Sequence, residues 1–125
     1  MKRFSHKAAS ELFDPSVLAG LTDNDERVFA AVVSSFLAQC PSLLHALAVA
    51  SHAGDAGDAA QAAFQAHAIK GMARNIGSAS LFSLARNAEA LAREGAPTEQ
   101  LVAAAAALQD EFGRLSLLLQ EYTGS

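Results

Sequence analysis

Four stretches of this chain repeat apolar residues at alternating intervals of three and four, which places them on one face of an α-helix. Alanine is the commonest residue and leucine the next, whereas β-branched residues are sparse outside residues 28–33. Because alanine and leucine favour helices, the sequence predicts an all-α fold. The most regular repeat continues for about six turns near the C-terminus: Leu101, Ala105, Leu108, Phe112, Leu115, Leu119 and Tyr122.

A short helix followed by a long one is predicted for the first part of the chain. Asp14 precedes Pro15, and an N-cap residue followed by proline at the first helical position starts a short helix, which ends at Gly20. Thr22 is expected to cap the second helix, with acidic residues in its first turn. The apolar spacing of this helix continues through Pro41, so one kinked helix is predicted, with a break at the proline as the alternative.

Three further helices are predicted after a turn-rich spacer at residues 51–58. The third spans about residues 59–76, Gly77 takes the left-handed position after its end, and Ser78 caps the fourth. A Gly-Ala-Pro segment stops the fourth helix, and the last begins near Thr98. Short loops between four long helices imply an antiparallel up-down-up-down four-helix bundle, with a short additional N-terminal helix.

Length and composition limit the organisation and the function of the chain. Its 125 residues fit one domain, which we place at residues 11–125 after a flexible N-terminal tail of residues 1–10. The formal net charge of -4 argues against binding to nucleic acid. Cys40 is the only cysteine, which excludes an internal disulfide and a cysteine-based zinc site and favours the reducing cytoplasm.

One long segment lacks charged residues and raises the question of a membrane span. No Asp, Glu, Lys or Arg occurs in residues 28–54. The basic N-terminus has no apolar stretch before its first acidic residues, so it does not fit a secretory signal. We therefore expect a cytoplasmic protein without membrane insertion, because polar and helix-breaking residues interrupt the uncharged segment: Ser34, Ser35, Gln39, Pro41, Ser42, His45, Ser51 and His52.

The third predicted helix carries the residue of most chemical interest, His67. At about 100° per residue, His67 lies about 140° from the centre of the apolar stripe of this helix, so its imidazole is expected to point outward. The stripe itself is expected to face the core: Ala62, Ala66, Ile69, Ala73 and Ile76. A solvated histidine without function is the alternative for such a residue taken alone.

The neighbours of His67 on the helix surface favour a functional interpretation. Lys70 and Arg74 bring positive charge to the same edge of the helix, and Phe64 is an apolar residue that points away from the core. Gly71 costs about 1 kcal/mol in a helix interior, and room for a partner or a phosphoryl group above His67 would explain it. The alternatives are a solvated face for the two cations, close helix packing for Gly71, and a contact with the fourth helix for Phe64.

Motifs for other chemistries are absent from the sequence. It has no G-x-x-x-x-G-K-[ST] loop, no G-x-G-x-x-G loop and no G-x-S-x-G elbow. Carboxylates close to His67 in sequence are too few for an acid–base pair. His6, His45 and His52 have no partner at metal-ligand spacing, and Cys40 lies on an apolar stripe, so we expect neither a metal site nor a cysteine nucleophile.

The residues from Ala66 to Gly77 form a recognisable motif: a histidine, an aliphatic residue two positions later, Lys-Gly, and a further glycine, here His67, Ile69, Lys70, Gly71 and Gly77. The motif resembles that of the histidine-containing phosphotransfer (HPt) domain family. Other residues also fall where this family has them: Asp14, Leu18, Phe36, Leu47, Leu81, Leu84 and Glu89. The resemblance extends over about residues 12–122.

This resemblance implies a monomeric carrier in a multistep His-Asp phosphorelay, with no kinase or ATP-binding domain of its own. His67 would accept a phosphoryl group from an aspartyl-phosphate on one receiver domain and pass it to a second receiver. These receivers would belong to response regulators and to a hybrid histidine kinase. Lys70 and Gly71 match the positions beside the family's histidine and would support the phosphoryl group, whereas Arg74 is assigned this role from its helix position alone.

The resemblance also implies where the partner docks and which groups it supplies. Phe64, Leu18 and Met72 are the candidate docking residues, and Gly77 ends the histidine helix. The chain would bind no cofactor, because Mg²⁺ would belong to the receiver. The alternative function is a helical adaptor or anti-regulator that binds a receiver or kinase without accepting phosphate, although a pure binding module has no need of His67 beside Lys70 and Gly71.

Overall fold

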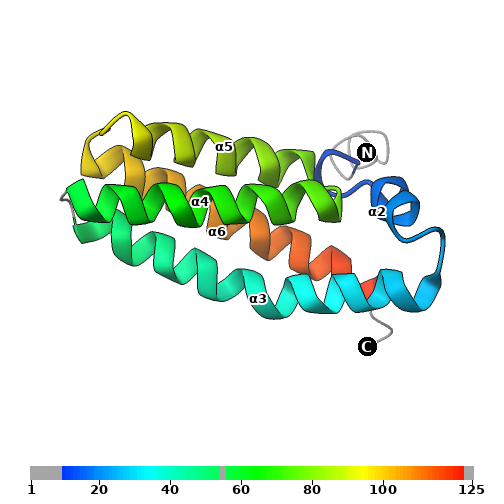
Figure 1. Ribbon diagram of the computed structural model, residues 1–125. Helices are drawn as coiled ribbons and strands as arrows, with labels where there is room; N and C mark the ends of the chain where they lie inside the picture. The colour runs from blue at the N-terminus through cyan, green and yellow to red at the C-terminus, as the bar shows by residue number, and fades with distance from the viewer. Residues whose placement is uncertain (1–9, 54–55, 123–125) are drawn as a thin grey trace, which may run out of the picture.

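The regular structure of the chain is helical. The computed structural model describes residues 10–53 and 56–122, and within these ranges there is no strand (Figure 1). The prediction of an all-α fold is therefore confirmed. The helices are α2 (Pro15–Leu21), α3 (Glu26–Ala53), α4 (Ala56–Ile76), α5 (Ala79–Arg93) and α6 (Thr98–Leu119), and a 3₁₀ turn follows at Gln120–Tyr122.

The four long helices lie side by side. Figure 1 shows α3 and α5 running in one direction and α4 and α6 in the other. Each long helix contacts the next along the chain, and α3 also contacts α6, which closes the arrangement around a single core. The short α2 lies at one end of the molecule, where it contacts α4 (Figure 1).

Alanine and aliphatic side chains fill the space between the helices. The inward face predicted for α4 is confirmed, since its members are at most 1% exposed: Ala62, Ala66, Ile69, Ala73 and Ile76. The neighbouring α5 adds Ala85, Ala88 and Ala92, and leucines such as Leu47 and Leu108 complete the core. Burial of each leucine contributes about 2 kcal/mol, so the apolar faces hold the helices together.

The turn between α2 and α3 differs from the prediction. Thr22 caps the C-terminus of α2 instead of the N-terminus of α3, because its hydroxyl donates a hydrogen bond to the Leu18 carbonyl at 2.9 Å. Asp23 and Asn24 then take positive φ angles of 53° and 59°. The start of α3 is capped by Asp25, whose carboxylate accepts hydrogen bonds from backbone N–H groups of the first turn.

Helix α3 is continuous through Pro41, so the alternative of a break there is wrong. Figure 1 shows that the helix bends along its length. The helix is long enough for a membrane span and contains an 18-residue window with a mean hydropathy of 1.5, yet it packs against α4 and α6. It buries Cys40 completely, and burial raises the pKa of this thiol to about 12, so the thiol stays protonated and behaves as a small apolar group.

The remaining predicted helix boundaries agree with the structure to different degrees. Residues 54–55 lie outside the described ranges, but α3 extends to Ala53 and α4 begins at Ala56, so the turn-rich spacer predicted at 51–58 is shorter than expected. Of the predicted tail at residues 1–10, only residue 10 is described, and it is helical. The last helix begins at Thr98 as predicted.

The turn between α4 and α5 follows the prediction and fixes the position of α2. Gly77 has a φ of +92°, and Ser78 caps α5 by accepting a hydrogen bond from the Leu81 N–H. The Gly77 carbonyl accepts a hydrogen bond from the Asp14 N–H at 2.9 Å, directly before α2. A Cβ at Gly77 would lie 2.7 Å from the Asp14 carbonyl oxygen, so the close approach of these two segments needs glycine.

We expect Gly77→Ala to lower the free energy of unfolding by about 3 kcal/mol, because the left-handed φ and the close carbonyl both penalise a Cβ. Gly95→Ala is the matched control, since Gly95 also has a positive φ but nothing lies within 4 Å of an added Cβ. Its cost should be about 1 kcal/mol. Urea denaturation monitored by circular dichroism measures both losses, and equal losses would contradict a role for the contact with Asp14.

Candidate functional site

His67 lies near the middle of α4 and points outward, as predicted. Its side chain is 63% exposed, although one edge of the ring faces the neighbouring helix. Nδ1 lies 3.0 Å from Oε2 of Glu89, which α5 contributes. The ring is thus held through one nitrogen, and the other nitrogen, Nε2, is left without a protein partner among the described residues.

Glu89 lies at the centre of the site, and only 7% of this residue is exposed. Besides His67, its carboxylate binds two cations, one from each of the two helices. Lys70 of α4 places Nζ 2.7 Å from Oε1. Arg93, one turn after Glu89 on α5, donates from Nε and Nη2 to Oε2 at 3.0 and 2.7 Å. Three side chains therefore meet one buried carboxylate.

The contacts around Glu89 determine its charge. Burial acts to raise the pKa of this carboxyl, but the hydrogen bonds from Lys70, Arg93 and His67 outweigh it and lower the pKa to about 2. At neutral pH Glu89 is therefore ionised and can only accept hydrogen bonds. It follows that Nδ1 of His67 carries the hydrogen, and that in a neutral ring the lone pair lies on the exposed Nε2.

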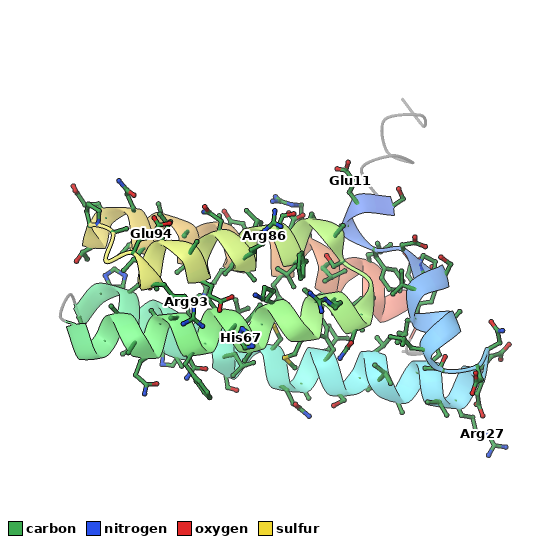
Figure 2. The ribbon with its side chains drawn as sticks, turned by 45° about the horizontal axis from the view of Figure 1, so that its top comes forward. Glu11, Arg27, His67, Arg86, Arg93 and Glu94 are labelled. Carbon is green, nitrogen blue, oxygen red and sulfur yellow. The ribbon has the colours of Figure 1, made fainter. Side chains whose placement is uncertain are left out.

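The charges of the site do not cancel. Lys70 and Arg93 contribute two positive charges against the one negative charge of Glu89, so a neutral His67 sits beside an excess of one positive charge. Arg93 is 61% exposed, and Figure 2 shows it next to His67 on the same face of the molecule. An anionic group bound at Nε2 would therefore be stabilised electrostatically.

The surface around His67 is open. Nothing lies within 4 Å of a Cβ built on Gly71, so close helix packing does not explain this glycine. Phe64 is 66% exposed, which rules out its burial against a fourth helix. A shallow groove runs beside the histidine and is lined in part by Ala63, Phe64, Ala92 and Arg93.

Three of the predicted site residues lie elsewhere. Arg74 does not approach His67, because its guanidinium stacks over the Phe82 ring of α5, 5.1 Å from the ring centroid. Leu18 is only 1% exposed and belongs to the core, so its side chain is not available to a partner, contrary to expectation. Met72 is partly buried and lines a small depression between α3 and α4.

The sequence did not reveal the roles of Glu89 and Arg93. A search for carboxylates close to His67 along the chain could not find Glu89, because that residue lies 22 positions away and reaches the histidine from another helix. The usable signal was the Glu89–Arg93 pair at i,i+4 on a helix predicted to run antiparallel to the histidine helix. No group of three potential metal-binding side chains occurs in the described part of the chain.

Comparisons with known proteins bear on the family and the fold of this chain. The family model of the Hpt domain matches residues 31–121. A search of curated proteins gave no significant match. A crystal structure of the HPT domain from an Hpt sensor hybrid histidine kinase of Shewanella is similar with a TM-score of 0.74 and 14% sequence identity, over 90% of this chain and 93% of that chain. Because the family model matches residues 31–121, which is more than half of the chain, the chain belongs to the Hpt domain family.

Proposed function

We propose that this chain is a phosphoryl carrier of a His-Asp phosphorelay in which Nε2 of His67 accepts a phosphoryl group from an aspartyl-phosphate of one receiver domain and passes it to an aspartate of another. Membership of the Hpt domain family supports a phosphorelay role. The observation that supports His67 as the carrier is its geometry: the side chain is 63% exposed while an ionised carboxylate holds Nδ1 at 3.0 Å.

The transfer forms one bond and breaks one bond. The lone pair of Nε2 attacks phosphorus, the bond between phosphorus and the aspartyl oxygen breaks, and the donor carboxylate leaves with the electron pair. The imidazole becomes positively charged as the N–P bond forms. Glu89 at Nδ1 opposes this charge and keeps the Nδ1 proton in place, so it is a positioning residue that favours reaction at Nε2.

The other residues of the site act on the phosphoryl group and its approach. Lys70 and Arg93 supply the excess positive charge that neutralises phosphoryl oxygens. Gly71 leaves the space that a receiver needs to bring its aspartate in line with Nε2. Phe64, which is exposed, and Met72, which is partly so, are the apolar residues that a receiver would cover.

The wider role follows from the same proposal. Hpt domains are phosphocarriers and not kinases, and the matched family model covers no kinase or ATP-binding domain. The receiver would therefore bring Mg²⁺, and the chain would act as a cytoplasmic monomer that binds no cofactor of its own. Residues 11–125 would form the functional domain.

Transfer of label from receiver domains phosphorylated on their aspartate tests the proposal directly. We expect acid-labile label on the wild-type chain and none on His67→Gln, because glutamine retains a polar side chain but has no nucleophilic nitrogen. The exposed position predicts that the variant keeps its helical content and cooperative melting. Label on the variant would contradict the assignment of His67, and selective binding without any transfer would favour the adaptor function.

Glu89→Gln should change how stability depends on pH. The folded-state pKa of about 2 lies below the ordinary value of 4.5, so the ionised carboxylate stabilises the fold above pH 4.5 and this contribution is lost as pH falls toward 2. We expect the variant to be less stable by about 2 kcal/mol at neutral pH, with a gap that narrows in acid. Urea denaturation at several pH values measures the difference in the free energy of unfolding.

The matched control is Glu94→Gln, which removes an exposed carboxylate, and a similar response in both variants would contradict the prediction.

Gly71→Ala should separate stability from function. An alanine in the helix interior should raise the free energy of unfolding by about 1 kcal/mol, since the added Cβ meets no neighbour. The same methyl group should slow phosphoryl transfer because it narrows the approach to His67. The matched control is Gly113→Ala in α6, which also meets nothing within 4 Å and should give the same stabilisation with an unchanged transfer rate. Equal transfer rates in the two variants would show that the open space at Gly71 is not used.

A further inference from the structure

Most of the Lys and Arg residues that the structure describes lie on one pair of helices. Four of them lie on α4 and α5, and we call this group the basic seam: Lys70, Arg74, Arg86 and Arg93. The acidic residues on the same two helices are Asp58, in the first turn of α4, and Glu89, which is buried and already paired. Because the whole chain has a net charge of -4, the basic seam is a local reversal of the molecule's charge.

Contacts between the antiparallel helices place these cations in order along the seam. His67 and Lys70 face Glu89, while Arg74 faces Phe82, which lies almost two turns earlier on α5. The basic seam therefore runs from Arg93 and Lys70, which lie beside His67, toward the end of α4, where Arg74 lies. Arg74 lies seven residues after His67, which at 1.5 Å per residue is about 10 Å along the helix axis.

Phe82 holds the far end of the basic seam in a defined arrangement. The guanidinium carbons of Arg74 and Arg86 lie 5.1 and 5.9 Å from the centroid of this ring, so one aromatic side chain orients two cations from two helices. Neither arginine forms a salt bridge with a carboxylate in the part of the chain that the structure describes, whereas Arg93 and Arg114 both do. Both guanidinium groups are exposed near one ring, so an anionic partner at this place would meet two positive charges.

We infer that the basic seam is the docking surface for the receiver domain, and that Arg74 and Arg86 bind carboxylates on the receiver at a distance from the phosphoryl group. The inference rests on the proposed function and names the surface through which it is performed. Charge complementarity favours this partner: a receiver brings the anion of its aspartyl-phosphate to His67, and the positive charges that continue along α4 and α5 favour a partner surface of negative charge around that anion. The α4–α5 face therefore fits such a surface, with His67 at one end and the paired arginines at the other.

The two ends of the basic seam have different roles in this proposal. Lys70 and Arg93 act where the phosphoryl group transfers, because both contact the carboxylate that positions His67. Arg74 and Arg86 turn toward Phe82 and not toward Glu89, so they act on encounter and orientation. Charges of this kind alter association rates and their salt dependence more than they alter the chemical step.

Phosphoryl transfer to an Arg74→Gln/Arg86→Gln variant tests the inference. We expect the apparent second-order rate constant, measured with phosphorylated receiver at limiting concentrations, to fall about tenfold at low salt. The maximal rate at saturating receiver should stay within about twofold of wild type, because His67, Lys70 and Arg93 are unchanged. The rate constant of the variant should also depend less on salt between about 50 and about 500 mM.

The matched control is Arg27→Gln/Arg114→Gln, which removes the same charge from exposed positions on α3 and α6. Figure 2 shows Arg27 at the end of the molecule distant from His67. The control should transfer phosphoryl groups within about twofold of wild type at every salt concentration. If the two double variants behave alike, the effect is one of net charge and the docking surface is wrong. If the Arg74→Gln/Arg86→Gln variant matches wild type, the inference is also overturned.

The experiment separates this inference from the proposed function. If wild type accepts the phosphoryl group and the Arg74→Gln/Arg86→Gln variant accepts it equally fast, the carrier function is supported and the proposed docking surface is wrong. If wild type accepts no label, the proposed carrier function is wrong. Titration calorimetry of the unphosphorylated receiver with each variant then tests whether the basic seam is a docking surface. A loss of affinity of about tenfold in the variant but not in the control would support it. Unchanged affinity, or no receiver binding by wild type, would overturn it.

Discussion

The close packing of α4 against α5 is the constraint on which the site depends. Both helices turn alanines toward the bundle core, among them Ala66 and Ala73 on α4 and Ala85 and Ala92 on α5. Short side chains allow helix axes to approach more closely than leucines would. Glu89 extends from α5 between these helices and reaches the side chains of α4, so the abundance of alanine that predicts the fold class also sets the distance across which the carboxylate acts.

A buried carboxylate is tolerated here because both of its oxygens have partners: Lys70 at Oε1, and His67 and Arg93 at Oε2. Burial alone disfavours the charged form of Glu89, and the donors from two helices reverse that preference. The result is a charge that is fixed in position and state, directly behind a histidine whose other face is exposed. The proposed chemistry of the exposed Nε2 thus depends on a carboxylate that is itself buried between two helices.

Periodicity in the sequence predicted what belongs to single helices. The inward face of α4, the outward direction of His67 and the turn at Gly77 follow from spacing and local backbone chemistry, and the structure agrees. Features that depend on neighbouring segments were not predicted. Glu89 reaches His67 from another helix, and Arg74 turns toward Phe82 because an aromatic ring of α5 lies within reach. A helical wheel gives direction on one helix but not the identity of the residue that faces it, since the register between helices is set by loops and core packing.

The shared carboxylate has a consequence for how this site can change over evolutionary time. Because His67, Lys70 and Arg93 all bind Glu89, loss of either cation also alters the proton affinity of the carboxylate and the hold on the imidazole. The effects of substitutions at these positions will therefore not add, and a double-mutant cycle between any two should show coupling. A sequence can leave such an arrangement only by coordinated replacement, so related chains with a different residue in place of Glu89 should also differ at one or more of the positions that bind it.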